Sequence, residues 1–226
     1  KKKYIVAVDL AGDLKDSKIR SGIEISEHEI RELFADKIVW EETCYWSTRE
    51  KRLKSVKREV LGRISLKSQI WANPPLDEIS NAIIAAIGDL GLNFRAAEKQ
   101  FIARVELGGA GFPNVGKSHL KATAKEWLAP FVNSIKTADD WKKFDYLPAL
   151  RNLLSWEQLS KLNELVPQHF VSPLGRKLLI DYTGEHPSVE LRLQELFGLK
   201  SHPMVKDKPL LVTLLSPAGR PLQKTM

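Results

Sequence analysis

Apolar and polar residues alternate over residues 1–72 in short runs that are typical of β-strands. Several runs are rich in Val and Ile and are bounded by turn residues, which favours strands over helices. The expected strands are 4–10, 18–25, 37–48, 52–62 and 64–71. Ser26, with Glu29 three residues later, has the spacing of a capping box and predicts one short helix to about Ala35. Strands interrupted by one short helix predict a small barrel or a curved sheet.

The hydrophobic period becomes helical after Pro74 and Pro75. Apolar residues then recur on one side of each segment, as in helices that face a core. The expected helices are 76–90, 94–107, 119–132, 139–154 and 155–165. A glycine-rich loop at 108–116 separates the second of these helices from the third.

The C-terminal part of the chain, over 168–226, has a mixed pattern. Residues 169–172 and 177–182 predict a hairpin, Pro187–Gly198 predicts a helix with Pro in its first turn, and Leu210–Leu215 predicts a buried strand. The fold class is therefore α+β. We expect one domain over 1–72 and a second over 73–226, which begins with helices and ends in a small mixed α/β part.

The composition is that of a globular protein, with 226 residues, 43% hydrophobic and 28% charged. These values exclude a generally disordered or collagen-like chain. No run of about 18 apolar residues occurs, so we expect no membrane partner. The single cysteine, Cys44, cannot form an internal disulfide, which favours a reducing, cytoplasmic compartment.

The net charge of +7 is carried by the two ends of the chain. Residues 1–75 have a net charge of +4, residues 76–167 of zero and residues 168–226 of +3. The densest stretch runs from Arg49 to Lys67, has a net charge of +6 and contains Arg49, Lys51, Arg52, Lys54, Lys57, Arg58, Arg63 and Lys67. Trp40, Tyr45 and Trp46 lie on the preceding strand. Dispersed cations beside aromatic rings favour nucleic-acid binding, and the alternative is an edge strand protected from aggregation by its charges.

Gly111, Gly116, Lys117 and Ser118 match the phosphate-binding pattern G-x-x-x-x-G-K-[ST]. In a P-loop, the backbone amides wrap the phosphates, the Lys reaches the β- and γ-phosphates, and the hydroxyl holds Mg²⁺. The context differs, because a helical stripe precedes the loop and consecutive helices follow it without intervening strands. We therefore expect a helix–helix loop, with a GTPase-like nucleotide-binding protein as the alternative.

No other pattern predicts a catalytic or metal site. The five histidines are scattered, and no His, Cys or carboxylate residues have metal-ligand spacing. No nucleophile elbow or carboxylate pair stands out either. We therefore name no catalytic residue, no metal ligand and no favoured cofactor-binding residue in this chain.

The C-terminal residues carry a family resemblance. Pro173–Val205 (PLGRKLLIDYTGEHPSVELRLQELFGLKSHPMV) and Leu210–Gln223 (LLVTLLSPAGRPLQ) resemble the C-terminal domain of HrpB-type ATP-dependent helicases, of the DEAH-box class. Residues 123–132 and Leu147–Leu165 are similar to the same domain. The N-terminal strands and helix resemble that family's oligonucleotide-binding (OB-type) barrel, entered part-way.

The resemblance implies an accessory part of an ATP-dependent helicase. ATP and Mg²⁺ would be bound by motor domains upstream in the parent chain, and none of the family's catalytic motifs has a counterpart here. The implied partners are these motor domains and nucleic acid, RNA in preference to DNA. A protein-interaction platform, with the basic ends meeting an acidic partner, is a further alternative.

Overall fold

The computed structural model describes residues 4–12 and 17–226. The chain divides into two compact units, Lys1–Ala82 and Ile83–Met226. The first consists mainly of strands, and the second contains most of the helices followed by small sheets. Together they confirm the α+β class.

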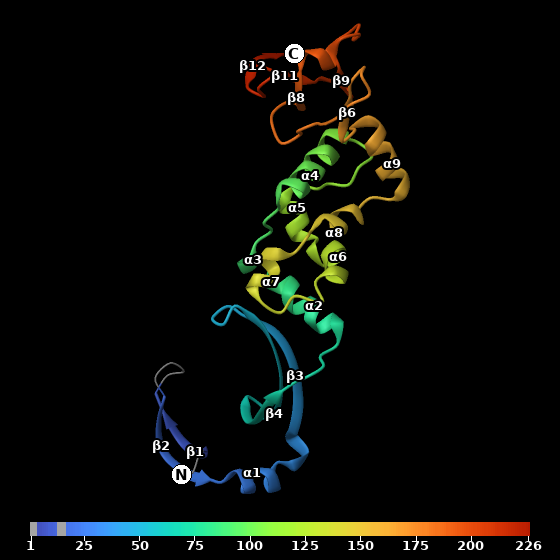
Figure 1. Cartoon of the computed structure of the whole chain (residues 1–226). Helices are drawn as coiled ribbons and strands as arrows, with labels where there is room; N and C mark the ends of the chain where they lie inside the picture. Colours follow the sequence, from blue (N-terminus) through green and yellow to red (C-terminus); the bar gives the residue numbers. More distant parts are fainter. Residues whose placement is uncertain (1–3, 13–16) are drawn as a thin grey trace. The chain divides into compact units, whose positions relative to one another are not determined.

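The first unit contains two antiparallel sheets (Figure 1). One sheet pairs β1 (Tyr4–Ala11) with β2 (Lys18–Ile25). The other has the order β3–β4–β5, formed by β3 (Ile38–Ser47), β4 (Arg52–Leu61) and β5 (Ile64–Ile70). Between them lie α1 (Glu27–Leu33) and a 3-10 turn, Ala35–Lys37. Among the described residues the two sheets share no strand pairing, so these strands form curved sheets and not a closed barrel.

The predicted capping box at the start of α1 is confirmed. The Ser26 hydroxyl accepts a hydrogen bond from the Glu29 amide at 3.2 Å, and the Ser26 amide donates to the Glu29 carboxylate at 2.7 Å. These two bonds satisfy backbone groups that a helix end otherwise leaves without partners. A local sequence signal was sufficient here because both partners lie within one turn.

The β1–β2 hairpin leaves apolar side chains uncovered. Val6 pairs with Ile23 and Leu10 pairs with Ile19 across the two strands, and register shifts separate the two pairs. All four side chains are exposed. A two-stranded hairpin is at best marginally stable alone in water. We therefore expect the hairpin to depend on contacts outside its own two strands.

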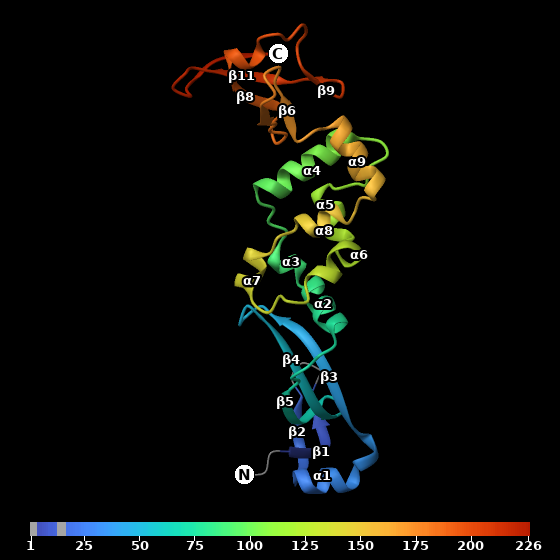
Figure 2. The same ribbon diagram turned by 45° about the vertical axis from the view of Figure 1, so that its right-hand side comes forward.

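A series of helices follows β5 along the chain (Figure 2). They are α2 (Leu76–Ala85), α3 (Ile87–Leu90), α4 (Ala96–Gly108), α5 (Lys117–Ala122), α6 (Ala124–Leu128), α7 (Ala138–Lys143), α8 (Leu147–Arg151) and α9 (Trp156–Leu165). Three predicted helices are broken: 76–90 at Ala86, 119–132 at Thr123, and 139–154 over Phe144–Tyr146. Phe144 is extended, and Pro148 opens α8, where its missing N–H is tolerated.

Aromatic residues form part of the core of the second unit. The Tyr146 ring meets Phe94, Trp141 and Phe144 edge-on, with ring centroids 4.9 to 5.6 Å apart. The Trp141 indole N–H donates to the Gly91 carbonyl oxygen at 2.9 Å. Edge-to-face pairs are favoured by the ring quadrupoles, and the indole bond satisfies a polar group inside the core. The interrupted chain between α7 and α8 is therefore held by packing.

The C-terminal part of the second unit contains small sheets. β6 (His169–Val171) and β7 (Lys177–Leu179) form the predicted hairpin. β8 (Ser188–Arg192), β11 (Leu211–Leu215) and β12 (Pro221–Thr225) form a sheet in the order β12–β11–β8. Two-residue strands, β9 (Met204–Val205) and β10 (Lys208–Pro209), pair with each other.

The predicted helix over Pro187–Gly198 is wrong. The structure has β8 followed by a 3-10 turn, Leu193–Leu196, and β8 pairs in parallel with β11. Val189 and Leu191 are each 2% exposed, whereas Glu190 and Arg192 are exposed. This period of two matches a strand with one buried face. β11, the strand that pairs with β8, is distant in the sequence. The local pattern of residues 187–198 therefore contains no information about this pairing.

Candidate nucleic-acid interface

The β3–β4–β5 sheet divides the predicted cations between its two faces. Alternate residues of a strand lie on opposite faces, and residues paired across strands share a face. Arg52, Lys54 and Arg58 therefore lie on one face of β4, together with Tyr45, which pairs with Lys54. We call these four residues the β4 basic face. The strand register brings together three of the eight predicted cations.

Lys57 and Lys67 lie on the opposite face of the same sheet. Lys57 pairs with Glu42, and Lys67 pairs with Glu59, which in turn lies opposite Trp40 on β3. The second predicted tryptophan, Trp46, shares this face. The predicted aromatic residues are thus divided as well, with only Tyr45 on the β4 basic face.

The remaining three predicted cations lie in turns. Arg49 and Lys51 are in the turn between β3 and β4, and Arg63 follows Gly62 in the turn between β4 and β5. The ten residues of β4 separate these turns by roughly 30 Å. The stretch that is dense in the sequence is therefore not one patch.

Two cations of the sheet already contact acidic side chains. Lys57 Nζ lies 2.7 Å from Glu42 Oε1 and 5.6 Å from the centre of the Trp40 ring. Lys54 forms an ion pair with Glu50. Exposed pairs of this kind contribute about 0–1 kcal/mol, so a phosphate can displace the carboxylate at low cost.

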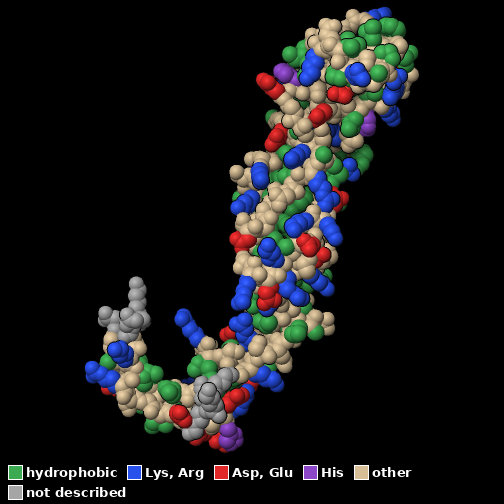
Figure 3. Space-filling view, turned by 60° about the vertical axis from the view of Figure 1, so that its left-hand side comes forward, with side chains coloured by type: hydrophobic (Ala, Val, Ile, Leu, Met, Phe, Trp, Pro, Cys, Tyr) green, Lys and Arg blue, Asp and Glu red, His purple; other side chains and the backbone are tan. Residues whose placement is uncertain are grey.

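Arg52 and Arg58 form no salt bridge with the other described residues, although Arg58 lies opposite Glu41 in the strand register. Figure 3 shows Lys and Arg side chains of the second unit interspersed with Asp and Glu side chains. On the β4 basic face, two cations outside any salt bridge of the described residues, Arg52 and Arg58, share a strand face with the Tyr45 ring.

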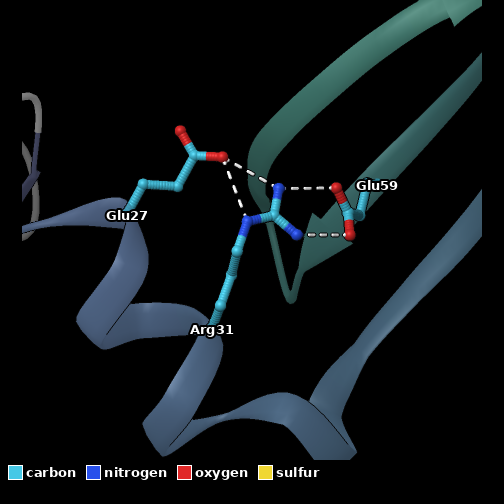
Figure 4. Close-up of polar contacts among 3 residues, drawn as sticks. All are labelled: Glu27, Arg31 and Glu59. Atoms are coloured by element: carbon cyan, nitrogen blue, oxygen red, sulfur yellow. Dashed lines mark hydrogen bonds and ion pairs between the residues drawn. The ribbon is translucent and has the colours of Figure 1, made fainter.

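A cluster of three charged residues attaches α1 to β4 (Figure 4). Arg31 donates from Nη1 and Nη2 to the two carboxylate oxygens of Glu59, each at 2.7 Å. It also donates to Glu27 at 2.8 and 3.2 Å. The hydrogen bonds from Arg31 hold the pKa of Glu59 below its usual range. The sequence analysis missed this cluster, although the i, i+4 spacing of Glu27 and Arg31 is a local signal.

We expect the Arg31–Glu59 pair to make the first unit sensitive to acid. Because the pKa of Glu59 is lowered in the folded state, its stabilising effect is fully present above the unfolded value near 4.5. That effect is lost as the pH falls through the lower, folded value. Thermal unfolding of the Glu59→Gln variant should show a deficit at pH 6–7 that becomes smaller as the pH is lowered below 4.5.

The matched control for this measurement is Asp36→Asn, which removes an exposed carboxylate from the same unit. It should unfold like the unchanged protein at every pH. A Glu59→Gln deficit that is the same at pH 3 as at pH 7 would contradict an electrostatic role for the pair.

The P-loop match lies between two helices, as the sequence predicts. α4 ends before it at Gly108, and α5 begins at Lys117 with Gly116 as its N-terminal cap. Val115 is 1% exposed, and the Gly111 carbonyl accepts a hydrogen bond from Gln158 at 2.8 Å. A P-loop requires a strand where α4 lies, so these residues do not fit an ATP–Mg²⁺ site of that kind. Saturable nucleotide binding that is lost in Lys117→Ala would be the evidence for the alternative.

Residues 4–12 and 17–226 contain no group of three or more His, Cys, Asp or Glu that could hold a metal ion. Nor does any helix in that part of the chain have the length and apolar character needed to cross a membrane.

Known proteins resemble this chain in sequence and in structure. The family of ATP-dependent helicase C-terminal regions, of the HrpB type, matches residues 127–226. The ATP-dependent RNA helicase HrpB of Escherichia coli K12 is 29% identical over 221 residues, which cover 93% of this chain and 27% of that protein. The crystal structure of the E. coli DExH-box NTPase HrpB covers 98% of this chain with a TM-score of 0.65 and 29% identity.

Over nearly its whole length the chain is similar to HrpB-type helicases, and its C-terminal residues match the family of their C-terminal regions. A second crystal structure, of the E. coli DEAH/RHA helicase HrpB, covers 97% of the chain with a TM-score of 0.63 and 27% identity. The HrpB-type similarity therefore includes the β3–β4–β5 sheet and extends beyond the family match. The chain spans less than a third of these relatives, 27% of the curated protein and 29% of each solved chain.

Proposed function

We propose that this chain is an accessory part of an ATP-dependent helicase and that its β4 basic face holds single-stranded RNA. The observation that carries the proposal is the alignment of Arg52, Lys54 and Arg58 on one face of β4 beside Tyr45. The relative's name supports RNA as the ligand, since that protein is an RNA helicase. ATP hydrolysis with Mg²⁺ is proposed for motor domains elsewhere in a longer, cytoplasmic protein.

The geometry of the β4 basic face suits a flexible, negatively charged strand. Arg52 and Lys54 are two residues apart on β4, which places their Cα atoms roughly 6.6 Å apart along the sheet. Side chains at this spacing can contact successive charges of an extended backbone. Tyr45 is half-buried in the same face and offers a ring on which a base can stack.

A salt titration of RNA binding tests this proposal. Three phosphate contacts predict that the logarithm of the association constant falls with the logarithm of salt concentration with a slope of about −2. Fluorescence anisotropy with a labelled single-stranded RNA measures this slope. A single-stranded DNA of the same sequence is the comparison for the RNA preference, and weaker DNA binding is expected. Affinity that does not change with salt would contradict phosphate contacts.

A second candidate function, a protein-interaction platform, is favoured by the exposed apolar side chains of the β1–β2 hairpin. Val6 and Ile23 form one exposed cross-strand pair, and Leu10 and Ile19 form another. In a longer helicase, the occupant we propose is the motor part of the same chain, because the relatives are more than three times as long as their matched stretch. Partner capture that survives nuclease treatment but is lost in Val6→Glu with Ile23→Glu would favour this second function.

A further inference from the structure

The second unit contains a cavity that the proposed RNA site does not use. It has a volume of about 250 Å³ and lies among α4, α8 and the β6–β7 hairpin region. Phe101, Leu147 and Leu179 contribute apolar walls, whereas Gln100, Arg104 and Arg151 contribute polar groups. None of the described residues that line it is Asp or Glu. The lining is therefore apolar with an excess of positive charge.

Arg104 is a buried cation whose hydrogen-bond partners are all neutral. Arg104 is 3% exposed. Nε and Nη2 donate to the carbonyl oxygen of Val166 at 2.8 and 2.7 Å, and Nη2 also donates to the Asn163 side-chain oxygen at 2.8 Å. Nη1 takes no part in these bonds. Among the described residues no carboxylate forms a salt bridge with Arg104.

A buried guanidinium without an anion is energetically unfavourable, because burial removes its hydration without supplying an opposite charge. Burial lowers the pKa of Arg104, and repulsion by Arg151 lowers it further, while Tyr182 acts in the opposite direction. Each of the two arginines thus makes the positive charge of the other less favourable. An anion between them would supply the missing opposite charge and reduce their repulsion.

Gln100 is fixed at the rim of the cavity by its own hydrogen bonds. Its side-chain oxygen accepts from the Tyr182 amide at 2.9 Å, and its amide group donates to Asp181. Asp181 in turn accepts from the amide and hydroxyl of Thr183 at 2.8 and 2.7 Å. The Asp181 carboxylate is therefore occupied by hydrogen bonds from Gln100 and Thr183.

We propose that this cavity binds a small organic anion, with a carboxylate or phosphate monoester between Arg104 and Arg151 and an apolar body against Phe101, Leu147 and Leu179. Mostly apolar walls with a few convergent polar groups are typical of small-molecule sites. Guanidinium groups match the planar geometry of carboxylates and phosphates. A cavity of about 150 Å³ accommodates benzene, so one ring with an anionic group fits here.

Calorimetric titration of the intact chain with phenyl phosphate and with benzoate tests this proposal. Saturable binding of at least one is expected, and the tighter of the two identifies the head group. Inorganic phosphate supplies charge without an apolar body, and benzyl alcohol supplies a ring without charge. Both should bind at least about tenfold more weakly, because each lacks one half of the interaction.

Arg151→Gln is the first variant to test, because Arg151 is exposed and its loss should not disturb the fold. We expect it to weaken binding by about tenfold. Lys161→Gln is the matched control: it removes one exposed positive charge from the same unit, away from the cavity, and binding should stay unchanged. Ala97→Phe fills the cavity from its exposed rim and should abolish binding without loss of thermal stability.

Three results would overturn the proposal. One is equal weakening by Arg151→Gln and Lys161→Gln, which would indicate only a general charge effect. Another is binding of benzyl alcohol as tight as that of phenyl phosphate. The third is the absence of saturable binding of both anions in the unchanged chain. RNA binding does not enter this test, so its failure would leave the β4 basic face unaffected.

Discussion

Replacing Arg52, Lys54 and Arg58 together by glutamate is expected to weaken the binding of single-stranded RNA by roughly a hundredfold at 0.1 M salt. The three side chains share one face of β4. Each phosphate contact on a single strand releases about 0.7 of a counterion, so three contacts account for about two powers of ten at this salt concentration. The salt slope should fall by about 2 in the same variant. Anisotropy titrations at several salt concentrations give both numbers.

The control must carry the same change in net charge. Lys121, Lys125 and Lys161 are exposed residues of the second unit, and their triple replacement by glutamate matches the first variant. It should retain most of the affinity and the salt slope, apart from a small long-range effect. Equal losses in the two variants would mean that RNA responds to total charge, and the β4 basic face would then have no special role.

Leu191→Ala is expected to lower the free energy of unfolding of the second unit by about 2–5 kcal/mol. Leu191 is 2% exposed in the parallel β8–β11 pair. Removing buried methyl groups loses their transfer free energy and leaves a cavity that the sheet can only partly close. Urea unfolding followed by fluorescence measures the loss.

Leu193→Ala makes the same chemical change two residues later and is the matched control. Leu193 is 55% exposed in the 3-10 turn after β8. Its replacement should cost less than about 1 kcal/mol, because exposed side chains lose little on truncation. Similar losses in both variants would contradict the burial of Leu191 in the β8–β11 pair.

Local patterns predicted the elements whose stabilising partners lie near in sequence. The Ser26–Glu29 capping box agrees with the structure for this reason, and so do the expected strands 37–48 and 52–62, which pair with each other as β3 and β4. Ser155, with Gln158 three residues later, also forms a capping box, at the start of α9. The sequence did not predict the interruptions within three of the expected helices. The break before α8 depends on how Phe144 and Tyr146 pack into the aromatic core, and the spacing of hydrophobic residues does not show this packing.

The candidate sites also have features that residue order determines and features that depend on the tertiary structure. The sequence alone determined that positive charge gathers over Arg49–Lys67 and that a family resemblance runs through the C-terminal residues, because both are properties of residue order. Only the tertiary structure decided which cations share a face, because strand pairing and the alternation of side chains place Arg52 and Arg58 apart from Lys57. It also brought Arg104 and Arg151 to one cavity, since these two residues are distant in the sequence and meet only when α4 and α8 pack together.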